Sequence, residues 1–130
     1  MDELNDYIGN VIKYIEIKIN TDFISNNDDV FVDEITLIFD DFEVLITPDI
    51  DTDEIILKKI MKRNLETAVI PNNIFDKYVN KKIQMIWKGI NTQGYLDLLT
   101  FGFNQLKPDI LILSEGSVLK IFKITSPLPR

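Results

Sequence analysis

The stretch of sequence that says most about the fold is residues 30–47, VFVDEITLIFDDFEVLIT. Its first half alternates between apolar and polar positions. Ile35, Leu37 and Phe39 therefore share one face of an extended strand, because successive side chains of a strand point to opposite faces. The two acids at 40–41 favour a tight turn, and the alternation then resumes. The stretch predicts a β-hairpin with one buried face.

Similar short runs of β-branched and aromatic residues recur on both sides of this hairpin, and turn residues separate them about every ten positions. The predicted strands are residues 11–19, 30–39, 42–47, 55–57, 83–87, 95–103, 110–113 and 118–124. In the strand at 83–87, Ile83, Met85 and Trp87 are expected on one face. The regular spacing indicates a sheet of sequential antiparallel strands.

Helical signals are few. A single turn is expected at residues 4–8, and Asn72 or Asn73 would cap a short helix through 74–79. No repeat or linker divides the chain, so we expect residues 1–130 to form a single compact domain. The fold class is predicted to be α+β, a strongly bent antiparallel sheet or open barrel of seven to eight short strands with one or two short helices.

The composition excludes several kinds of chemistry. The 130 residues include no Cys and no His, which excludes disulfides, sulfur-ligated zinc and catalytic triads that need an imidazole. A metal site would need oxygen ligands throughout, as for calcium or magnesium. The acidic N-terminus does not fit a secretory signal, and there is no apolar run of about 18 residues. A cytoplasmic protein is expected.

Charge is distributed unevenly along the chain. The net charge is −7, and residues 19–57 contain twelve acids and no Lys or Arg, whereas residues 58–130 contain twelve bases and five acids. One interpretation is that the two halves neutralise each other through surface pairs of about 0 to 1 kcal/mol each. The other is an acidic face that meets a cationic partner. Nucleic acid is a poor partner, because phosphates require a basic face.

The loop at residues 49–54, DIDTDE, has acids at the first, third and fifth positions of a helix-loop-helix calcium motif. Glu54 stands where that motif requires Gly, and Ile60 stands where it requires a bidentate Glu. The flanking segments are also predicted strands. We therefore expect a solvated acidic loop, with no metal and no other cofactor. The acids lie mainly in turns, where burial would not raise a carboxyl pKa for acid–base catalysis, so no enzyme activity is expected.

Residues 87–97, WKGINTQGYLD, form the densest group of unusual residues. Trp87 and Tyr95 straddle a turn and would stack across a hairpin, while Asn91 and Gly94 suit the turn itself. The structural interpretation is a pinned hairpin. The functional interpretation is an aromatic and polar contact surface, of the residue types found in interface hot spots.

The spacing Trp-x3-Asn-x-Gln-Gly-Tyr-x-Asp in residues 87–97 resembles the signature of a small bacterial family of unknown function. Residues 51–55, DTDEI, resemble a second recurring segment of that family. The resemblance covers residues 30–124. It implies a small bacterial cytosolic protein and carries over no catalytic residue. Families of this kind often lie beside toxin and immunity genes.

The expected function is that of an immunity protein that binds and neutralises a cognate bacterial toxin through an acidic surface. The expected partner is a toxin domain with a basic surface, with neither nucleic acid nor a membrane involved. The alternative is a phage-type inhibitor that imitates DNA against a host defence enzyme, which would need acids spaced like phosphates along an elongated surface. A metal protein, an enzyme and a plain assembly module are the remaining alternatives.

The partner-binding surface is expected to combine the acids of three turns with the aromatic residues of the hairpin. Its predicted residues are Asp22, Asp28, Asp29, Asp40, Asp41, Asp49, Asp51, Asp53, Glu54, Trp87 and Tyr95. Phe23 or Phe42 would serve as an apolar anchor. The hypothesis requires these acids to lie together and to face outward once the chain folds.

Overall fold

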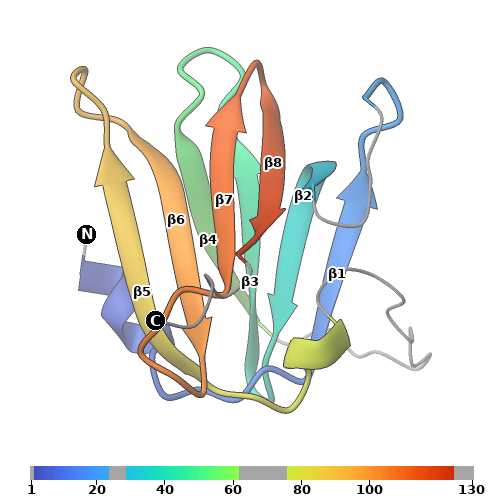
Figure 1. Ribbon diagram of the computed structural model, residues 1–130, viewed down its shortest axis with the longest axis vertical. Coiled ribbons are helices and arrows are strands. Elements are labelled where there is room, and N and C mark those ends of the chain that lie inside the picture. Colours follow the sequence, from blue (N-terminus) through green and yellow to red (C-terminus); the bar gives the residue numbers. More distant parts are fainter. Residues whose placement is uncertain (1, 24–28, 62–75, 125–130) are drawn as a thin grey trace, which may run out of the picture.

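The computed structural model describes residues 2–23, 29–61 and 76–124. They form eight antiparallel strands in one curled sheet, with two short 3-10 helices (Figure 1). The elements are η1 (Asp2–Tyr7), β1 (Tyr14–Ile19), β2 (Asp29–Ile38), β3 (Phe42–Pro48), β4 (Ile55–Met61), η2 (Asp76–Tyr78), β5 (Ile83–Ile90), β6 (Leu96–Phe103), β7 (Ile110–Glu115) and β8 (Val118–Lys123). Each of the eight segments predicted as strands contains a strand in the described residues.

The hairpin predicted from residues 30–47 is also confirmed. Strands β2 and β3 pair with Ile35 opposite Ile46 and Leu37 opposite Val44, and all four side chains are buried. The strand order across the sheet is β4-β3-β2-β8-β7-β6-β5. Strands β3 and β8 pair with different parts of one edge of β2, and β1 pairs with the opposite edge. Strand β2 therefore joins the two halves of the sheet.

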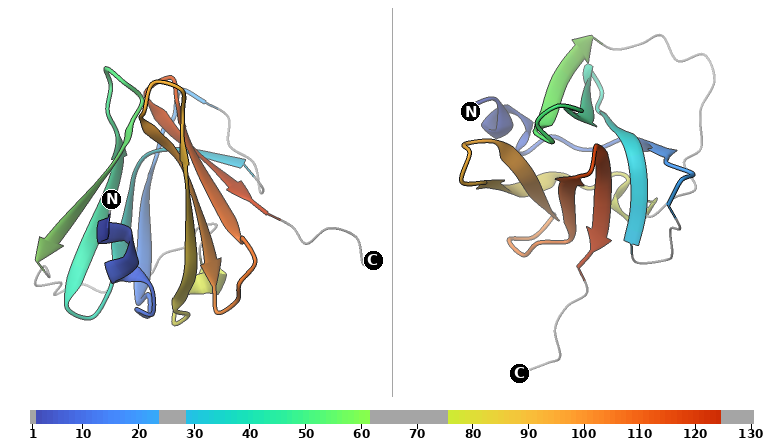
Figure 2. Two further views of the ribbon diagram at one scale, coloured as in Figure 1. Left: turned by 90° about the vertical axis from the view of Figure 1, so that its left-hand side faces the viewer. Right: turned by 90° about the horizontal axis from the view of Figure 1, so that it is seen from above.

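Backbone contacts outside the strands curl the sheet into a half-barrel (Figure 2). The segment before β1 meets the start of β5, because the Gly9 amide donates to the Ile83 carbonyl at 2.7 Å and the Ile12 amide donates to the Lys81 carbonyl at 2.9 Å. Val11 and Lys82 form a further isolated bridge. The two sides of the sheet are tied together at this end.

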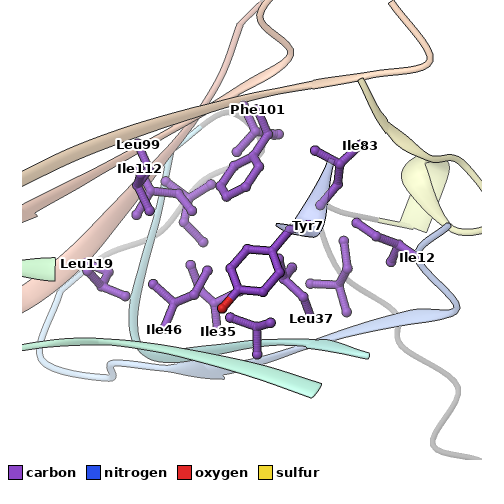
Figure 3. Close-up of a cluster of buried hydrophobic side chains, with 14 of the residues drawn as sticks. Tyr7, Ile12, Ile35, Leu37, Ile46, Ile83, Leu99, Phe101, Ile112 and Leu119 are labelled. Carbon is purple, nitrogen blue, oxygen red and sulfur yellow. The ribbon is translucent and has the colours of Figure 1, made fainter. Parts of the chain in front are cut away.

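Apolar side chains fill the concave side of the half-barrel (Figure 3). Ile35 and Ile46 from one half of the sheet and Leu99 from the other are fully buried. Helix η1 adds Tyr7, whose ring stacks on Phe42 at 6.0 Å between centroids. Each fully buried aliphatic or aromatic side chain contributes about 1.5 to 3 kcal/mol to folding, so this shared core holds the two halves together.

The α+β assignment is supported only loosely, because the helical elements in the described part of the chain are two 3-10 segments of six and three residues. The turn expected at 4–8 corresponds to η1. The helix expected through 74–79 falls partly outside the described residues, and its described part contains the single turn Asp76–Tyr78. The sheet accounts for nearly all of the observed regular structure.

The prediction that Ile83, Met85 and Trp87 share one face of β5 is wrong. The pairing of β5 with β6 shifts register between Ile83 and Met85, and such a bulge places one extra residue in a strand and reverses the alternation beyond it. Ile83 is buried and Ile86 packs against the core. Met85 and Trp87 therefore lie on the convex face.

The connection between β6 and β7 folds back closely over β6. A Cβ atom at Gly102 would lie 2.6 Å from the backbone oxygen of Lys107 and 2.8 Å from that of Gln105. The Asp109 carboxylate holds this loop in place by accepting from the Phe103 amide at 2.8 Å and from the Gln105 side-chain amide at 2.6 Å. Backbone atoms fixed in this way cannot move aside cheaply.

We therefore predict that Gly102→Ala lowers the free energy of unfolding by about 2 kcal/mol, because overpacking against backbone forces the chain to shift. Urea denaturation measures the change. Gly89→Ala is the matched control, because its Cβ would meet the movable side chain of Leu98 at 3.0 Å. Equal stability of the Gly102→Ala variant and the unsubstituted protein would contradict the close approach.

Candidate functional site

Four connections lie at the same end of the sheet, at the top of Figure 1. They are residues 20–23 after β1, 49–54 between β3 and β4, 91–95 between β5 and β6, and 115–117 between β7 and β8. We call this region the acidic end. It contains six carboxylates and no Lys or Arg: Asp22, Asp49, Asp51, Asp53, Glu54 and Glu115.

The carboxylates of the acidic end are not neutralised by lysines from the second half of the chain. Within the residues that the structure describes, none of the six forms an ion pair. Asp22 and Asp51 are exposed, as is Glu115, and Glu54 is half-buried. The local field is therefore negative and open to solvent.

The loop at 49–54 is ordered by its own side chains. Asp49 Oδ1 accepts hydrogen bonds from the amides of Asp51 at 2.8 Å and Thr52 at 3.2 Å. Thr52 Oγ1 in turn accepts from the Glu54 amide at 3.2 Å. These short-range bonds are those of an Asp-initiated turn, and they fix the direction in which the exposed Asp51 projects.

Asp53 connects this loop to the turn between β7 and β8. Its carboxylate accepts hydrogen bonds from the Ser117 amide at 2.7 Å and the Gly116 amide at 3.2 Å. Gly116 and Ser117 both have positive φ, and so does Asp53 itself, at 58°. Successive amides in this conformation form an anion-binding concavity. Asp53 is thus engaged within the chain, a role that depends on contact with a distant turn and has no local signal in the sequence.

Asp40 and Asp41 lie elsewhere. They form the turn between β2 and β3 at the opposite end of the sheet (Figure 1), where Asp40 makes a 3.8 Å ion pair with Lys13. Asp28 lies outside the described residues. Asp29 begins β2, where its backbone is paired with Phe122. The structure therefore brings together only part of the predicted acidic set.

The hairpin at 87–97 is pinned by Asn91, as the structural interpretation predicted. Asn91 Oδ1 accepts from the amides of Gln93 at 2.9 Å and Tyr95 at 3.2 Å, and its side-chain amide donates to Asp97 at 3.3 Å. Gly94 has a φ of 87°, which suits a residue without a Cβ. The expected stacking of Trp87 on Tyr95 is wrong, because the strand register places Thr100 opposite Trp87.

The fold changes the ionisation of Tyr78. Burial raises the pKa of Tyr78 to about 12, and the negative charge of Asp109 adds to the shift. The ring stacks on Phe103 at 4.5 Å, and the Lys77 ammonium lies 5.1 Å from its centroid. This phenol stays neutral at physiological pH and belongs to the core at the end opposite the acidic end.

The described residues contain no cluster of metal-ligating side chains and no candidate membrane-spanning helix. In residues 2–23, 29–61 and 76–124, no group of three or more acidic side chains gathers closely enough to hold a metal ion. Neither of the helices in these ranges is long or apolar enough to cross a bilayer.

The structure defines a class of protein with a curled antiparallel sheet and acidic loops at one end, two of which are joined by hydrogen bonds to Asp53. A family model described as "Family of unknown function (DUF6334)" matches residues 1–127. The chain belongs to this family. No curated protein and no solved structure matches it.

We predict that Asp53→Ala lowers the free energy of unfolding by about 1 to 2 kcal/mol, because two backbone amides lose a charged acceptor and Ala tolerates positive φ poorly. Urea denaturation measures the loss. Asp51→Ala removes an exposed acid from the same loop and is expected to change stability by less than about 0.5 kcal/mol. Equal effects of the two substitutions would contradict the role assigned to Asp53.

We predict from the raised pKa of Tyr78 that its phenol ionises only near pH 12. A group whose folded pKa lies above its unfolded pKa contributes stability that is complete below the unfolded value of 10.0 and is lost as pH rises through about 12. Ultraviolet titration of the unsubstituted protein should show a tyrosine ionisation step near pH 12. That step should be missing in Tyr78→Phe, and its persistence would contradict the assignment.

Proposed function

We propose that this protein is an immunity protein that neutralises a bacterial toxin by covering a basic surface of the toxin with the acidic end. One observation carries the proposal. Six carboxylates lie at the same end of the sheet, on connections that contain no Lys or Arg, and within the described residues none of them is paired with a cation. Toxins that cut or bind polyanions have basic clefts, and complementary charge speeds association and selects the partner.

The rigidity of the acidic end supports the same proposal. Asp53 ties two of the four loops together, and Asn91 orders a third. Loops that are already held in one conformation lose less entropy when a partner binds. A surface of this kind suits tight and specific recognition.

The structure changes which residues best suit the interface. Asp51, Glu54, Asp22 and Glu115 have no charged partner within the described chain. Phe23, which is 45% exposed, is better placed as an apolar anchor than the half-buried Phe42, which packs against the core.

The predicted acids at Asp40 and Asp41 lie at the other end of the sheet, so one interface does not include both groups. This separation also gives less support to the DNA-imitating alternative, which needs a continuous line of acids.

The test uses the full chain and any toxin domain that a gene neighbouring its own encodes. We expect the two proteins to bind and the chain to restore growth to cells that produce the toxin. We also expect the association rate constant to fall by about tenfold or more as salt rises from about 0.05 to 0.5 M, because screening shortens the range of exposed charges. Stopped-flow kinetics at several salt concentrations measures this dependence.

Charge reversal locates the interface. Asp51→Lys with Glu54→Lys should weaken binding by about a hundredfold, since each lost charge pair adds to the effect. Asp40→Lys with Asp41→Lys makes the same change in net charge at the opposite end and serves as the matched control. Salt-independent association, or equal loss of binding in both double variants, would contradict the proposal.

A further inference from the structure

The convex side of β5, β6, β7 and β8 and the start of β2 is unusually apolar. An antiparallel sheet that packs one face on a core normally carries polar residues on the other. Here two adjacent cross-strand rows carry large apolar groups. We call this surface the convex face, and the apolar members of its two rows are Trp87, Leu98, Leu111, Leu113, Phe122 and Phe31.

Strand register shows that these side chains point away from the core. Directly paired residues share a face of a sheet, and Trp87, Thr100, Leu111 and Phe122 form one paired row. Phe101, Ile112 and Ile121, which directly follow Thr100 and Leu111 and precede Phe122 in the chain, are buried in the core. The six apolar residues of the convex face are each half-buried rather than covered.

The apolar surface of the convex face extends to β5, the strand at the edge of the sheet. A Cβ at Gly89 would lie 3.0 Å from the Leu98 side chain, so Leu98 leans across β5 and fills the space above Gly89. The second row consists of Leu98, Leu113, Lys120 and Phe31. Lys120 is its charged residue, and the Lys120 ammonium lies 5.1 Å from the ring of Phe31 and 4.7 Å from that of Phe122. Contacts of this kind stabilise the cation in place.

The acidic end borders the convex face on one side. Phe23 stacks on Phe31 at 5.0 Å and follows Asp22 directly in the chain. Along β7, the convex face passes from Leu113 to the exposed Glu115 two residues later. An aromatic and aliphatic centre with a charged border is the usual anatomy of a protein–protein interface.

We propose that the convex face is the apolar centre of the partner interface, and that its occupant is a protein segment presenting aliphatic side chains flanked by Lys or Arg. This inference rests on the proposed function for its charged border. Charge complementarity selects this occupant. A second copy of the chain carries the same net charge of −7, so long-range electrostatics favour a cationic partner over self-association.

The experiment uses a short synthetic peptide with alternating Leu and Lys, titrated into the isotope-labelled full chain and followed by nuclear magnetic resonance. We expect amide shifts to concentrate on β6, β7 and β8 and at residues 20–23. A peptide alternating Leu and Glu should not bind, and one alternating Ser and Lys should bind about tenfold more weakly than the Leu and Lys peptide.

Two variants test the convex face itself. Trp87→Ala and Leu113→Ser should each weaken binding of the Leu and Lys peptide by about tenfold. The spectrum of each free variant reports its fold, and Leu113→Ser remains informative if Trp87→Ala does not fold. The control is Asp40→Lys with Asp41→Lys, which should bind unchanged because that turn lies at the other end of the sheet.

The outcomes separate the two proposals. If Asp51→Lys with Glu54→Lys abolishes binding while Leu113→Ser binds fully, the acidic end stands and the convex face is overturned. If Leu113→Ser weakens binding while the charge reversal does not, the convex face stands and the acidic end fails. Sedimentation that shows a dimer dissociated by Leu113→Ser would identify a second copy as the occupant and overturn the proposal.

Discussion

The structure depends on strand β2, because it pairs with three other strands. One edge pairs with β1 along most of its length, and the other pairs first with β8 and then with β3. A register shift near Asp33 lets Val32 and Ile35 both reach the core, although they are three residues apart. Without the extra residue, one half of the strand would turn its apolar side chains to solvent. The side chain of Asn20 donates to Asp33 at 2.8 Å and holds this irregularity.

Much of the fold could be predicted because apolar residues recur at every second position within the individual strands. Ile35, Leu37 and Val44 are buried as the alternation required. The prediction failed at Met85 and Trp87, because a bulge in β5 depends on how that strand pairs with β6. Bulges arise from the fit between neighbouring strands, so one strand read alone does not reveal them.

The candidate site was predictable in its chemistry and only partly in its placement. Consecutive antiparallel strands send their connections to alternate ends of a sheet, which is why Asp22 and Asp51 share one end while Asp40 lies at the other. The role of Asp53 could not be predicted, because its partners Gly116 and Ser117 come 63 and 64 residues later in the chain. The number of acids was visible in the sequence, but which of them are already occupied was not.

The one-sided placement of the carboxylates gives the molecule a permanent electric dipole moment. Six negative groups lie at one end with no lysine or arginine among them, whereas at the other end Lys13 and Lys82 are interspersed with acids. In the field of a positively charged macromolecule, such a dipole experiences a torque before any atoms touch. A larger share of random encounters would then begin in an orientation suited to docking.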